Sequence, residues 1–161
     1  MKYERIVIVC TGNICRSPIA EALLRARLAK SGHGAVEVSS MGVRGLEGCP
    51  ATPEARKACS ENGIDISAHR ARGLVAAELA EADLVFTMDL VQRELVVETC
   101  PELESRTFLL AAWPHEAGLN DVVRDPIGRP LRVYRQVFAD IDSHVQRILP
   151  YLVQGRHRSM S

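Results

Sequence analysis

The chain has 161 residues, 47% of them hydrophobic and 25% charged, and its 20 lysines and arginines balance 20 aspartates and glutamates. A chain of this length fits one domain that can bury most of its apolar surface. The net charge of zero argues against a nucleic acid or a membrane surface as a partner held by bulk electrostatics.

The N-terminus and the cysteines of the chain indicate the cellular compartment of the protein. The N-terminus leads straight into an apolar run without a signal-peptide pattern, and no apolar stretch is long enough to span a membrane. The five cysteines are an odd number and lack the spacing of a disulfide framework or of a zinc site. These features predict a cytoplasmic protein with no metal and no other cofactor.

Short apolar runs alternate along the chain with segments of helical periodicity. The first run, residues 6–9, is β-branched and typical of a buried parallel strand. After a loop, Pro18 stands where the first turn of a helix would begin, and that helix ends before Ser31. The later elements are predicted as strands at 36–40, 82–88 and 107–111, helices at 53–62, 75–81 and 89–98, and a last helix after Pro130.

This alternation predicts an α/β protein. We expect a single domain over residues 1–154, with a four-stranded parallel sheet flanked by helices on both faces, and a polar C-terminal tail at 155–161. Sites in such sheets lie beyond the carboxyl ends of the strands. Cys10, Ser40, Asp89 and the loop after residue 111 all fall at such ends, which predicts a site at that edge.

The loop after the first strand carries a cysteine and an arginine, Cys10 and Arg16, separated by five residues. This spacing suits a loop that curls back with its N–H groups inward beside a helix N-terminus, an arrangement that attracts anions and favours a thiolate. Arg16 offers a planar fork that matches two phosphate oxygens. Ser17 is predicted to donate its hydroxyl to the sulfur and to serve as the helix N-cap. The chemistry indicated is attack by sulfur on a bound phosphoryl group.

Expulsion of an alcohol or a phenol needs a general acid as well. Asp125 is the best candidate, because the long loop that carries it follows a strand end and can reach the phosphate loop. On its own, however, the pair Asp125-Pro126 more often marks the start of a turn. The residues alone leave both interpretations open.

The string from Cys10 to Pro18, Cys-Thr-Gly-Asn-Ile-Cys-Arg-Ser-Pro, resembles in full the signature of the low-molecular-weight protein tyrosine phosphatases. In that family the signature also follows the first strand. The resemblance implies a phosphate-binding loop with Cys10 as nucleophile and Arg16 as the arginine that binds phosphate, and it makes Asp125 the general acid. The loop residues implied to bind the substrate are Thr11, Gly12, Asn13, Ile14, Cys15 and Ser17.

The family also supports its loop with Asn, Ser and His side chains that reach the serine after the catalytic arginine. Asn13, Ser17, Ser40 and His69 match those positions. Asn13 also tolerates the positive φ that a tight loop of this kind requires. Without the resemblance, His69 would be interpreted as a surface histidine in a basic stretch.

Cys15 has two interpretations. Several members of the family carry this second thiol, which can close a reversible disulfide on an oxidised Cys10. It can equally be a small buried hydrophobe. The sequence assigns no role to Cys49, Cys59 or Cys100, although Cys59 falls on the core face of its helix.

Three activities occur on this scaffold in related proteins. Thiol-linked arsenate reduction needs two further cysteines after the third strand, and residues 60–99 contain none. Ile14 is typical of tyrosine phosphatases, whereas a threonine there favours phosphoarginine. The residues Ile127-Gly128 look more like an arginine phosphatase, and Leu46 replaces a wall residue that is often aromatic. Because Ile14 touches the substrate most directly, we predict phosphotyrosine, with protein phosphoarginine as the alternative.

A non-catalytic phosphate-binding or redox-sensing module would lack the nucleophile or the acid, and both Cys10 and Asp125 are present. The sequence therefore predicts a cysteine-dependent phosphatase that acts on a phosphorylated protein through a cysteinyl-phosphate intermediate. A weak homodimer is a further prediction.

Overall fold

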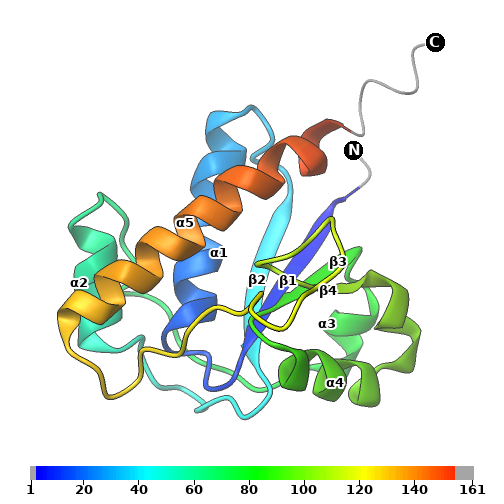
Figure 1. Ribbon diagram of the computed structural model, residues 1–161, viewed down its shortest axis with the longest axis horizontal. Helices are drawn as coiled ribbons and strands as arrows, with labels where there is room; N and C mark the ends of the chain where they lie inside the picture. Colours follow the sequence, from blue (N-terminus) through cyan, green and yellow to red (C-terminus); the bar gives the residue numbers. More distant parts are fainter. Residues whose placement is uncertain (1–2, 155–161) are drawn as a thin grey trace.

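The computed structural model describes residues 3–154, so the predicted tail at 155–161 lies outside the described residues. At its centre is a four-stranded parallel sheet in the order β2-β1-β3-β4 (Figure 1). The strands are β1 (Arg5–Cys10), β2 (Glu37–Gly42), β3 (Leu84–Thr87) and β4 (Thr107–Leu109). The predicted α/β fold with four parallel strands is confirmed. Within residues 3–154, no helix is long and apolar enough to cross a membrane.

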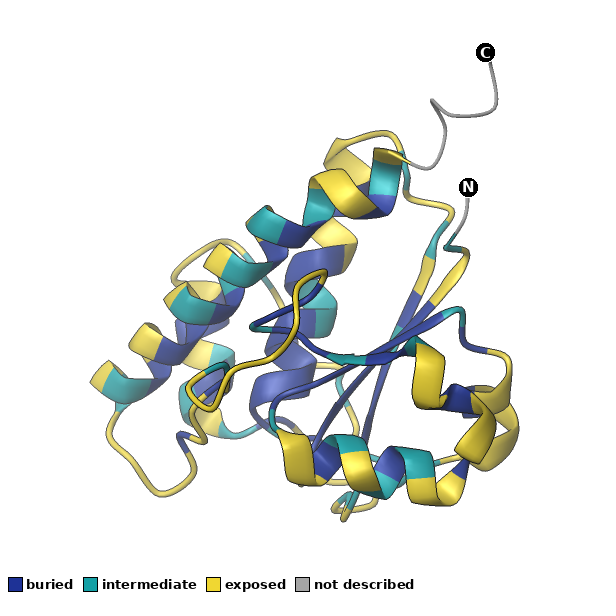
Figure 2. Cartoon of the chain, turned by 45° about the vertical axis from the view of Figure 1, so that its right-hand side comes forward, coloured by how far each residue is buried: buried dark blue, intermediate teal, exposed yellow. Residues whose placement is uncertain are grey.

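Helices cover both faces of the sheet. Successive residues of β1 point to opposite sides, so each face of the strand packs against its own layer of helices. One layer comprises α1 (Arg16–Lys30), α2 (Pro53–Ser60) and α5 (Leu131–Val153), and the other comprises α3 (Ala76–Ala80), α4 (Leu90–Thr99) and the 3-10 helix η1 (Pro101–Arg106). Ile6 and Ile8 pack in the core of the first layer, whereas Val7 and Val9 pack in the core of the second. Figure 2 shows the strands buried between helices whose outer surfaces are exposed.

The parallel register brings the carboxyl ends of the strands together. Cys10 of β1 is level with Gly42 of β2, and Val9 of β1 is level with Thr87 of β3. Thr87 is in turn level with Leu109 of β4. The loops that follow the four strands therefore meet at one edge of the sheet, where a ligand site is expected.

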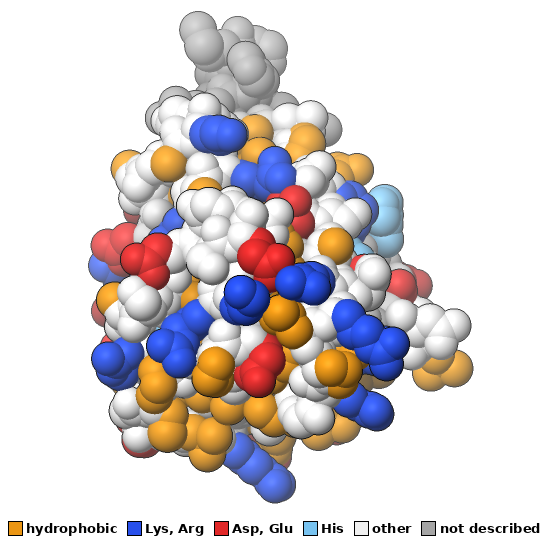
Figure 3. All heavy atoms as spheres, turned by 90° about the vertical axis from the view of Figure 1, so that its left-hand side faces the viewer, with side chains coloured by type: hydrophobic (Ala, Val, Ile, Leu, Met, Phe, Trp, Pro, Cys, Tyr) orange, Lys and Arg blue, Asp and Glu red, His pale blue; other side chains and the backbone are white. Residues whose placement is uncertain are grey.

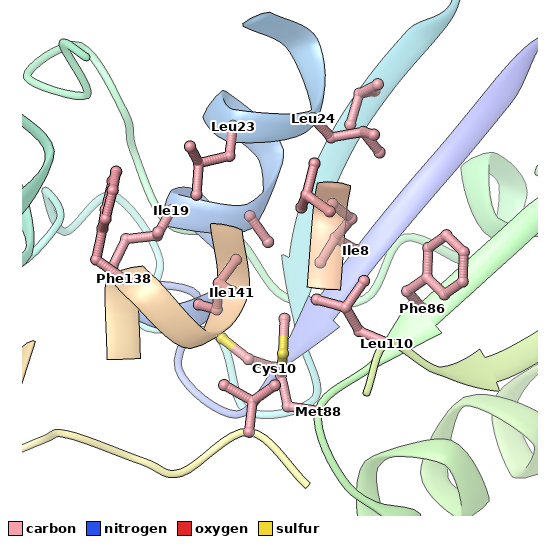
Figure 4. Packing of buried hydrophobic residues seen from close by; sticks show 14 of the residues in the cluster. Ile8, Cys10, Ile19, Leu23, Leu24, Phe86, Met88, Leu110, Phe138 and Ile141 are labelled. Carbon is pink, nitrogen blue, oxygen red and sulfur yellow. The ribbon is translucent and has the colours of Figure 1, made fainter. Parts of the chain in front are cut away.

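The apolar core extends up to this edge. Side chains from α1 and α5 pack over the end of β1, and Cys10 itself belongs to that cluster. Figure 4 shows Cys10 at the strand end with Met88 and Ile141 nearby. Close packing of this kind resists deformation, so the segment that begins at Cys10 rests on a rigid base.

The start of α1 differs from the prediction. The helix begins at Arg16 with Cys15 as its N-cap residue, and no side chain caps it. The predicted start at Pro18 and the predicted N-cap role of Ser17 are therefore wrong. The loop runs directly into the helix, so Ser17 already lies in the first turn and its hydroxyl bonds to the sulfur of Cys10 instead.

Two other helix starts agree with the sequence. Thr52 caps α2 by accepting a hydrogen bond from the N–H of Ala55 (3.3 Å), and Asp89 caps α4 by accepting one from the N–H of Gln92 (2.8 Å). Strand β4 is shorter than predicted and ends at Leu109, because the residues that follow it form turns.

Candidate active site

The loop between β1 and α1 has its carbonyl groups turned outward. The carbonyl oxygens of Cys10, Thr11, Gly12 and Ile14 accept hydrogen bonds from backbone N–H groups of the segment 43–52, at 2.9–3.1 Å. In a trans peptide plane, the N–H of one residue points away from the carbonyl before it. The N–H groups that follow these carbonyls therefore point to the inside of the loop, as the sequence analysis predicted for an anion-binding loop.

Asn13 fixes the bend of this loop. Its φ is 59° and its side chain is fully buried. Its Oδ1 accepts a hydrogen bond from the backbone N–H of Arg72 (3.0 Å), which sets the orientation of the side-chain amide. The Nδ2 group then donates to the hydroxyls of Ser17 (2.8 Å) and Ser40 (2.9 Å). The predicted contact among Asn13, Ser17 and Ser40 is present.

The hydroxyl of Ser17 lies 2.9 Å from the sulfur of Cys10. Because the Ser17 oxygen already accepts a hydrogen bond from Asn13, its proton is directed to the sulfur. This orientation stabilises a thiolate at Cys10, which is only 2% exposed and ends β1. A thiolate is the nucleophilic form of a cysteine.

His69 contacts the backbone of the loop. Its Nε2 donates to the carbonyl oxygen of Asn13 (2.7 Å), since a carbonyl can only accept. The histidine therefore lies at the site, as the resemblance implied, and it is partly buried. It turns one more carbonyl outward, so the N–H of Ile14 also points to the inside of the loop.

Arg16 connects the loop to the segment that carries the candidate acid. Its side chain is only 5% exposed, and its Nη1 donates to the carbonyl oxygen of Val123 (3.0 Å). Its Nη2 lies 3.4 Å from the hydroxyl oxygen of Thr11 and 3.6 Å from the Oδ2 of Asp125. The structure therefore brings Asp125 within reach of the loop, although the two residues are far apart in sequence. The Asp125 Oδ1 also accepts a hydrogen bond from the N–H of Ile127 (3.1 Å), so the turn expected of an Asp-Pro pair is present as well.

A cavity of about 300 Å³ opens over the loop. Leu46 and Ile127 stand at its sides and are 49% and 51% exposed. The pocket is lined by Cys10, Thr11, Gly12, Ile14, Cys15, Arg16, Arg44, Leu46, Asp125 and Ile127. It therefore combines a polar base that suits a phosphoryl group with aliphatic walls that suit an apolar substituent.

Cys15 faces the same cavity but is almost fully buried. Its sulfur lies 3.5 Å from the hydroxyl of Tyr134 and 3.6 Å from that of Thr52. Burial raises the pKa of the Cys15 thiol, and the hydrogen bonds from Tyr134 and Thr52 only partly offset this effect. All five cysteines are free, and the thiol of Cys59 lies in the core, where burial raises its pKa to about 12.

Sequence reasoning missed Gln92, which supports the loop from α4. This buried side chain accepts a hydrogen bond from the N–H of Met88 (2.8 Å) and donates to the hydroxyl of Thr11 (3.1 Å). Its signal was a polar residue on the buried face of a helix, three residues after the cap Asp89.

Gly42 was also missed. A Cβ atom at this position would lie 2.5 Å from the carbonyl oxygen of Thr11 and 3.0 Å from the backbone nitrogen of Asn13. Only glycine lets β2 pass this close to the loop. Neither Gly42 nor Arg72 belongs to a local motif. Gly42 lies against the backbone of the loop and the N–H of Arg72 bonds to Asn13, and in both cases the loop is distant in sequence.

A cysteine and an arginine in an anion-binding loop, at the carboxyl edge of a parallel sheet, define a phosphatase site of the cysteine-dependent class. Comparison with known proteins identifies the family. The family description "Low molecular weight phosphotyrosine protein phosphatase" matches residues 5–157. The chain belongs to this family, and it is an enzyme that hydrolyses phosphoric monoesters.

The relatives carry two different activities in their names. The chain is 35% identical to a protein-arginine-phosphatase of Geobacillus stearothermophilus, over 89% of this chain and 93% of that protein. It is 36% identical to the low molecular weight protein-tyrosine-phosphatase Etp of Escherichia coli, over 77% of this chain and 80% of that protein. A solved low molecular weight protein tyrosine phosphatase from T. tengcongensis superimposes with a TM-score of 0.84 at 36% identity, covering 91% of this chain and 98% of its own.

Proposed function

We propose that the protein hydrolyses phosphotyrosine in phosphorylated proteins through a cysteinyl-phosphate intermediate. One observation carries this proposal. The sulfur of Cys10, the guanidinium of Arg16 and the carboxyl of Asp125 face one cavity that is large enough for an aryl phosphate.

In the first step, the phosphoryl oxygens occupy the loop and accept hydrogen bonds from its inward N–H groups and from Arg16. The thiolate of Cys10 attacks phosphorus, and the bond between phosphorus and the tyrosine oxygen breaks. Asp125 gives its proton to the leaving phenolate oxygen, so the product departs as a neutral phenol.

In the second step, a water molecule attacks the cysteinyl phosphate. The Asp125 carboxylate formed in the first step accepts a proton from this water, and the bond between phosphorus and sulfur breaks. Inorganic phosphate leaves, and Cys10 returns as a thiolate that accepts the hydroxyl proton of Ser17. No electron transfer occurs, so the cycle needs no redox partner.

The aliphatic character of the walls supports phosphotyrosine as the substrate. Ile14, Leu46 and Ile127 line the cavity above the loop, where a phenolic ring would bury its faces against them. A phosphoarginine would place a polar planar group against the same side chains and lose hydrogen bonds to water, at a cost of about 1–3 kcal/mol.

The second candidate is a protein arginine phosphatase. Two observations favour it: the identity of 35% to the Geobacillus stearothermophilus enzyme, and the absence of an aromatic residue at Ile127-Gly128. Arsenate reduction has no support, because residues 60–99 supply no cysteine for a thiol relay.

A comparison of kcat/KM on phosphotyrosine and phosphoarginine, in one peptide sequence, tests the choice. We expect the wild type to prefer phosphotyrosine, and Ile14→Thr to shift the ratio toward phosphoarginine by roughly tenfold to a hundredfold. Leu46→Thr serves as the matched control, because it places the same hydroxyl higher on the wall. If the wild type turns over phosphoarginine faster, the arginine phosphatase replaces our first choice.

The remaining predictions belong with this proposal. A cytoplasmic enzyme agrees with five free cysteines, and residues 1–154 would form the catalytic domain, with 155–161 as a tail. Cell fractionation checks the compartment. A weak homodimer remains a prediction, which analytical ultracentrifugation over a range of concentrations would check.

A further inference from the structure

Five arginines differ from all the others in the described part of the chain. Within residues 3–154, ten arginine side chains form an ion pair or a hydrogen bond. The five that form neither are Arg44, Arg56, Arg124, Arg129 and Arg132. An arginine carries a permanent charge and five donors, so these side chains have donors left to bind an anion, although the Nε of Arg56 is itself buried.

Three of these five arginines lie on the segments that border the catalytic cavity. Arg44 lines the cavity itself. Arg124 and Arg129 stand on either side of Asp125 and Ile127, which line it as well.

The other two, Arg56 and Arg132, belong to α2 and α5, whose residues do not line the cavity. Both helices contact the loop through Cys15, whose sulfur lies near the hydroxyls of Thr52, the N-cap of α2, and Tyr134 of α5. Figure 3 shows the face that carries α2 and the start of α5, where Lys and Arg side chains lie among apolar, Asp and Glu side chains.

Most acidic side chains of the same segments are already engaged. Glu47 accepts a hydrogen bond from the N–H of Gly73 (2.7 Å), and Asp121 accepts one from the N–H of Gly118 (2.7 Å). Asp125 is held by Arg16 and by its own turn. Glu54 and Glu116 are the unbonded acids, so unpaired cations outnumber unpaired anions around the cavity.

We propose that a rim, defined as Arg44, Arg124 and Arg129, selects protein substrates whose phosphorylated residue is flanked by acidic side chains. The inference rests on the proposed function and names the class of substrate for that same site. The charge of the rim is complementary to such a segment, while the exposed Leu46 and Ile127 contact the apolar parts of the residue that enters.

The rim supplies recognition of a segment rather than binding of the phosphoryl group. The loop N–H groups and Arg16 already provide donors for that group, and the rim arginines belong to other segments of the chain. Exposed ion pairs are individually weak, so the selection comes from several pairs acting together and is screened by salt. It acts on association, which raises kcat/KM more than kcat.

The test uses the full chain and two phosphotyrosine peptides of equal length, one with Asp and Glu at three positions on either side and one with Asn and Gln there. At low ionic strength we expect a kcat/KM about tenfold higher for the acidic peptide. At about 0.5 M salt, where charges are screened within a few ångströms, the advantage should fall below about twofold. Equal values for the two peptides at low salt would overturn the proposal.

Variants assign the effect to the rim. Arg44→Gln and Arg129→Gln should each lower the ratio of acidic to neutral peptide by about twofold to fivefold. Lys30→Gln is the matched control. This substitution removes the same charge, but from an exposed residue at the far end of α1. If Lys30→Gln lowers the ratio as much as the rim variants do, the preference reflects net charge and the rim has no role.

Two further measurements separate this inference from the proposed function. Hydrolysis of p-nitrophenyl phosphate reports on the catalytic site alone, so an enzyme that hydrolyses it but shows no flank preference leaves the function intact and overturns the inference. If phosphoarginine proves to be the substrate, the same acidic and neutral peptides made with phosphoarginine give the comparison. Binding to phosphatidylserine vesicles that is lost in Arg129→Gln, without any peptide preference, would assign the rim to a membrane and overturn the proposal.

Discussion

The loop from Cys10 to Arg16 (the phosphate loop) and the segment 114–128 (the acid loop) carry the residues proposed for phosphate binding and for acid catalysis, and they are built very differently. In the loop from Cys10 to Arg16, five carbonyl groups are bonded to other segments and the Asn13 side chain is fully buried. The segment 114–128 is mostly exposed, with Leu119 at 92%. Among residues 3–154, its long-range bonds run through Val123 and Asp125 alone. Phosphate binding is therefore preorganised, whereas the acid depends on one anchor.

This anchor includes Arg16, the arginine proposed to bind phosphate. The N–H of Val123 donates to the carbonyl oxygen of Met88 (3.0 Å), and the carbonyl oxygen of Val123 accepts from Arg16 (3.0 Å). Arg16 thus holds the acid loop with one Nη atom, while the other lies near Asp125. The position of the acid is coupled to the group that binds phosphate, although the acid loop has little packing of its own.

The largest expected effect comes from the centre of the rigid half. Cys10→Ser should reduce turnover of p-nitrophenyl phosphate to background, because a serine hydroxyl is not ionised at neutral pH and cannot replace the thiolate. Binding of vanadate should remain measurable, since the loop N–H groups and Arg16 are unchanged. Isothermal titration with vanadate and a turnover assay check both outcomes. Retained turnover in this variant would contradict the cysteinyl-phosphate mechanism.

The second effect concerns the exposed half. Asp125→Asn should slow hydrolysis of phenyl phosphate by roughly 10²–10⁴-fold, because a poor leaving group needs a proton. The loss on p-nitrophenyl phosphate should be much smaller, since that phenolate leaves without one. Asparagine keeps the Oδ1 that accepts from the N–H of Ile127, so the turn and the thermal midpoint should be preserved. Equal losses on both substrates would indicate that Asp125 only shapes the loop.

The same contrast explains what the sequence could predict. The phosphate loop is a contiguous string, so its chemistry could be recognised from local spacing between Cys10 and Pro18. Its supports could be recognised only in part. Asn13 and Ser40 act through their side chains, so the resemblance to the family could identify them. Arg72 contributes only a backbone N–H, which any residue except proline could supply.

Helix geometry accounts for the one clear error at the site. Ser17 was expected to cap α1, because serine is a common N-cap and Pro18 a common first-turn residue. In the structure the helix begins two residues earlier, at Arg16, so that Cys15 takes the cap position and Pro18 is the third helical residue. Because proline has no N–H to offer a cap, this start leaves less for a side-chain cap to satisfy, and none forms.

A third prediction tests whether the rigidity of the loop depends on close approach by β2. Gly42→Ala places a Cβ atom 2.5 Å from the carbonyl oxygen of Thr11 and should lower the free energy of unfolding by about 1–3 kcal/mol. Because the loop must shift, kcat/KM on p-nitrophenyl phosphate should fall as well. Denaturant unfolding and steady-state kinetics give the two values.

Gly34→Ala is the control for this variant. Its Cβ would meet ordinary contacts, the nearest being the Cα of Ala29 at 3.7 Å. We expect little change in stability or in activity. If the two variants behave alike, the close contact between Gly42 and the loop does not limit either property.

The smallest expected effect concerns Cys15, which lies in the rigid half and has a raised pKa because of its burial. We predict that its thiol protects an oxidised Cys10 by forming a disulfide, with release of water from the sulfenic acid. A raised pKa keeps this thiol protonated at neutral pH, and its thiolate fraction grows about tenfold per pH unit below that pKa. Protection should therefore increase as the pH rises from neutral toward alkaline values.

Each protein is treated with peroxide and then with a reducing thiol, and the recovered activity is measured. The recovered activity of the wild type is divided by that of Cys15→Ser at each pH, so that effects common to both proteins cancel. We expect a ratio near one below neutral pH and a several-fold ratio above it. Tyr134→Phe sharpens the test, because its hydroxyl is the strongest of the hydrogen bonds that lower the pKa of Cys15. Without this donor the thiolate forms less readily, so protection should begin at a higher pH. A ratio of one at every pH would mean that Cys15 only fills space beside α5.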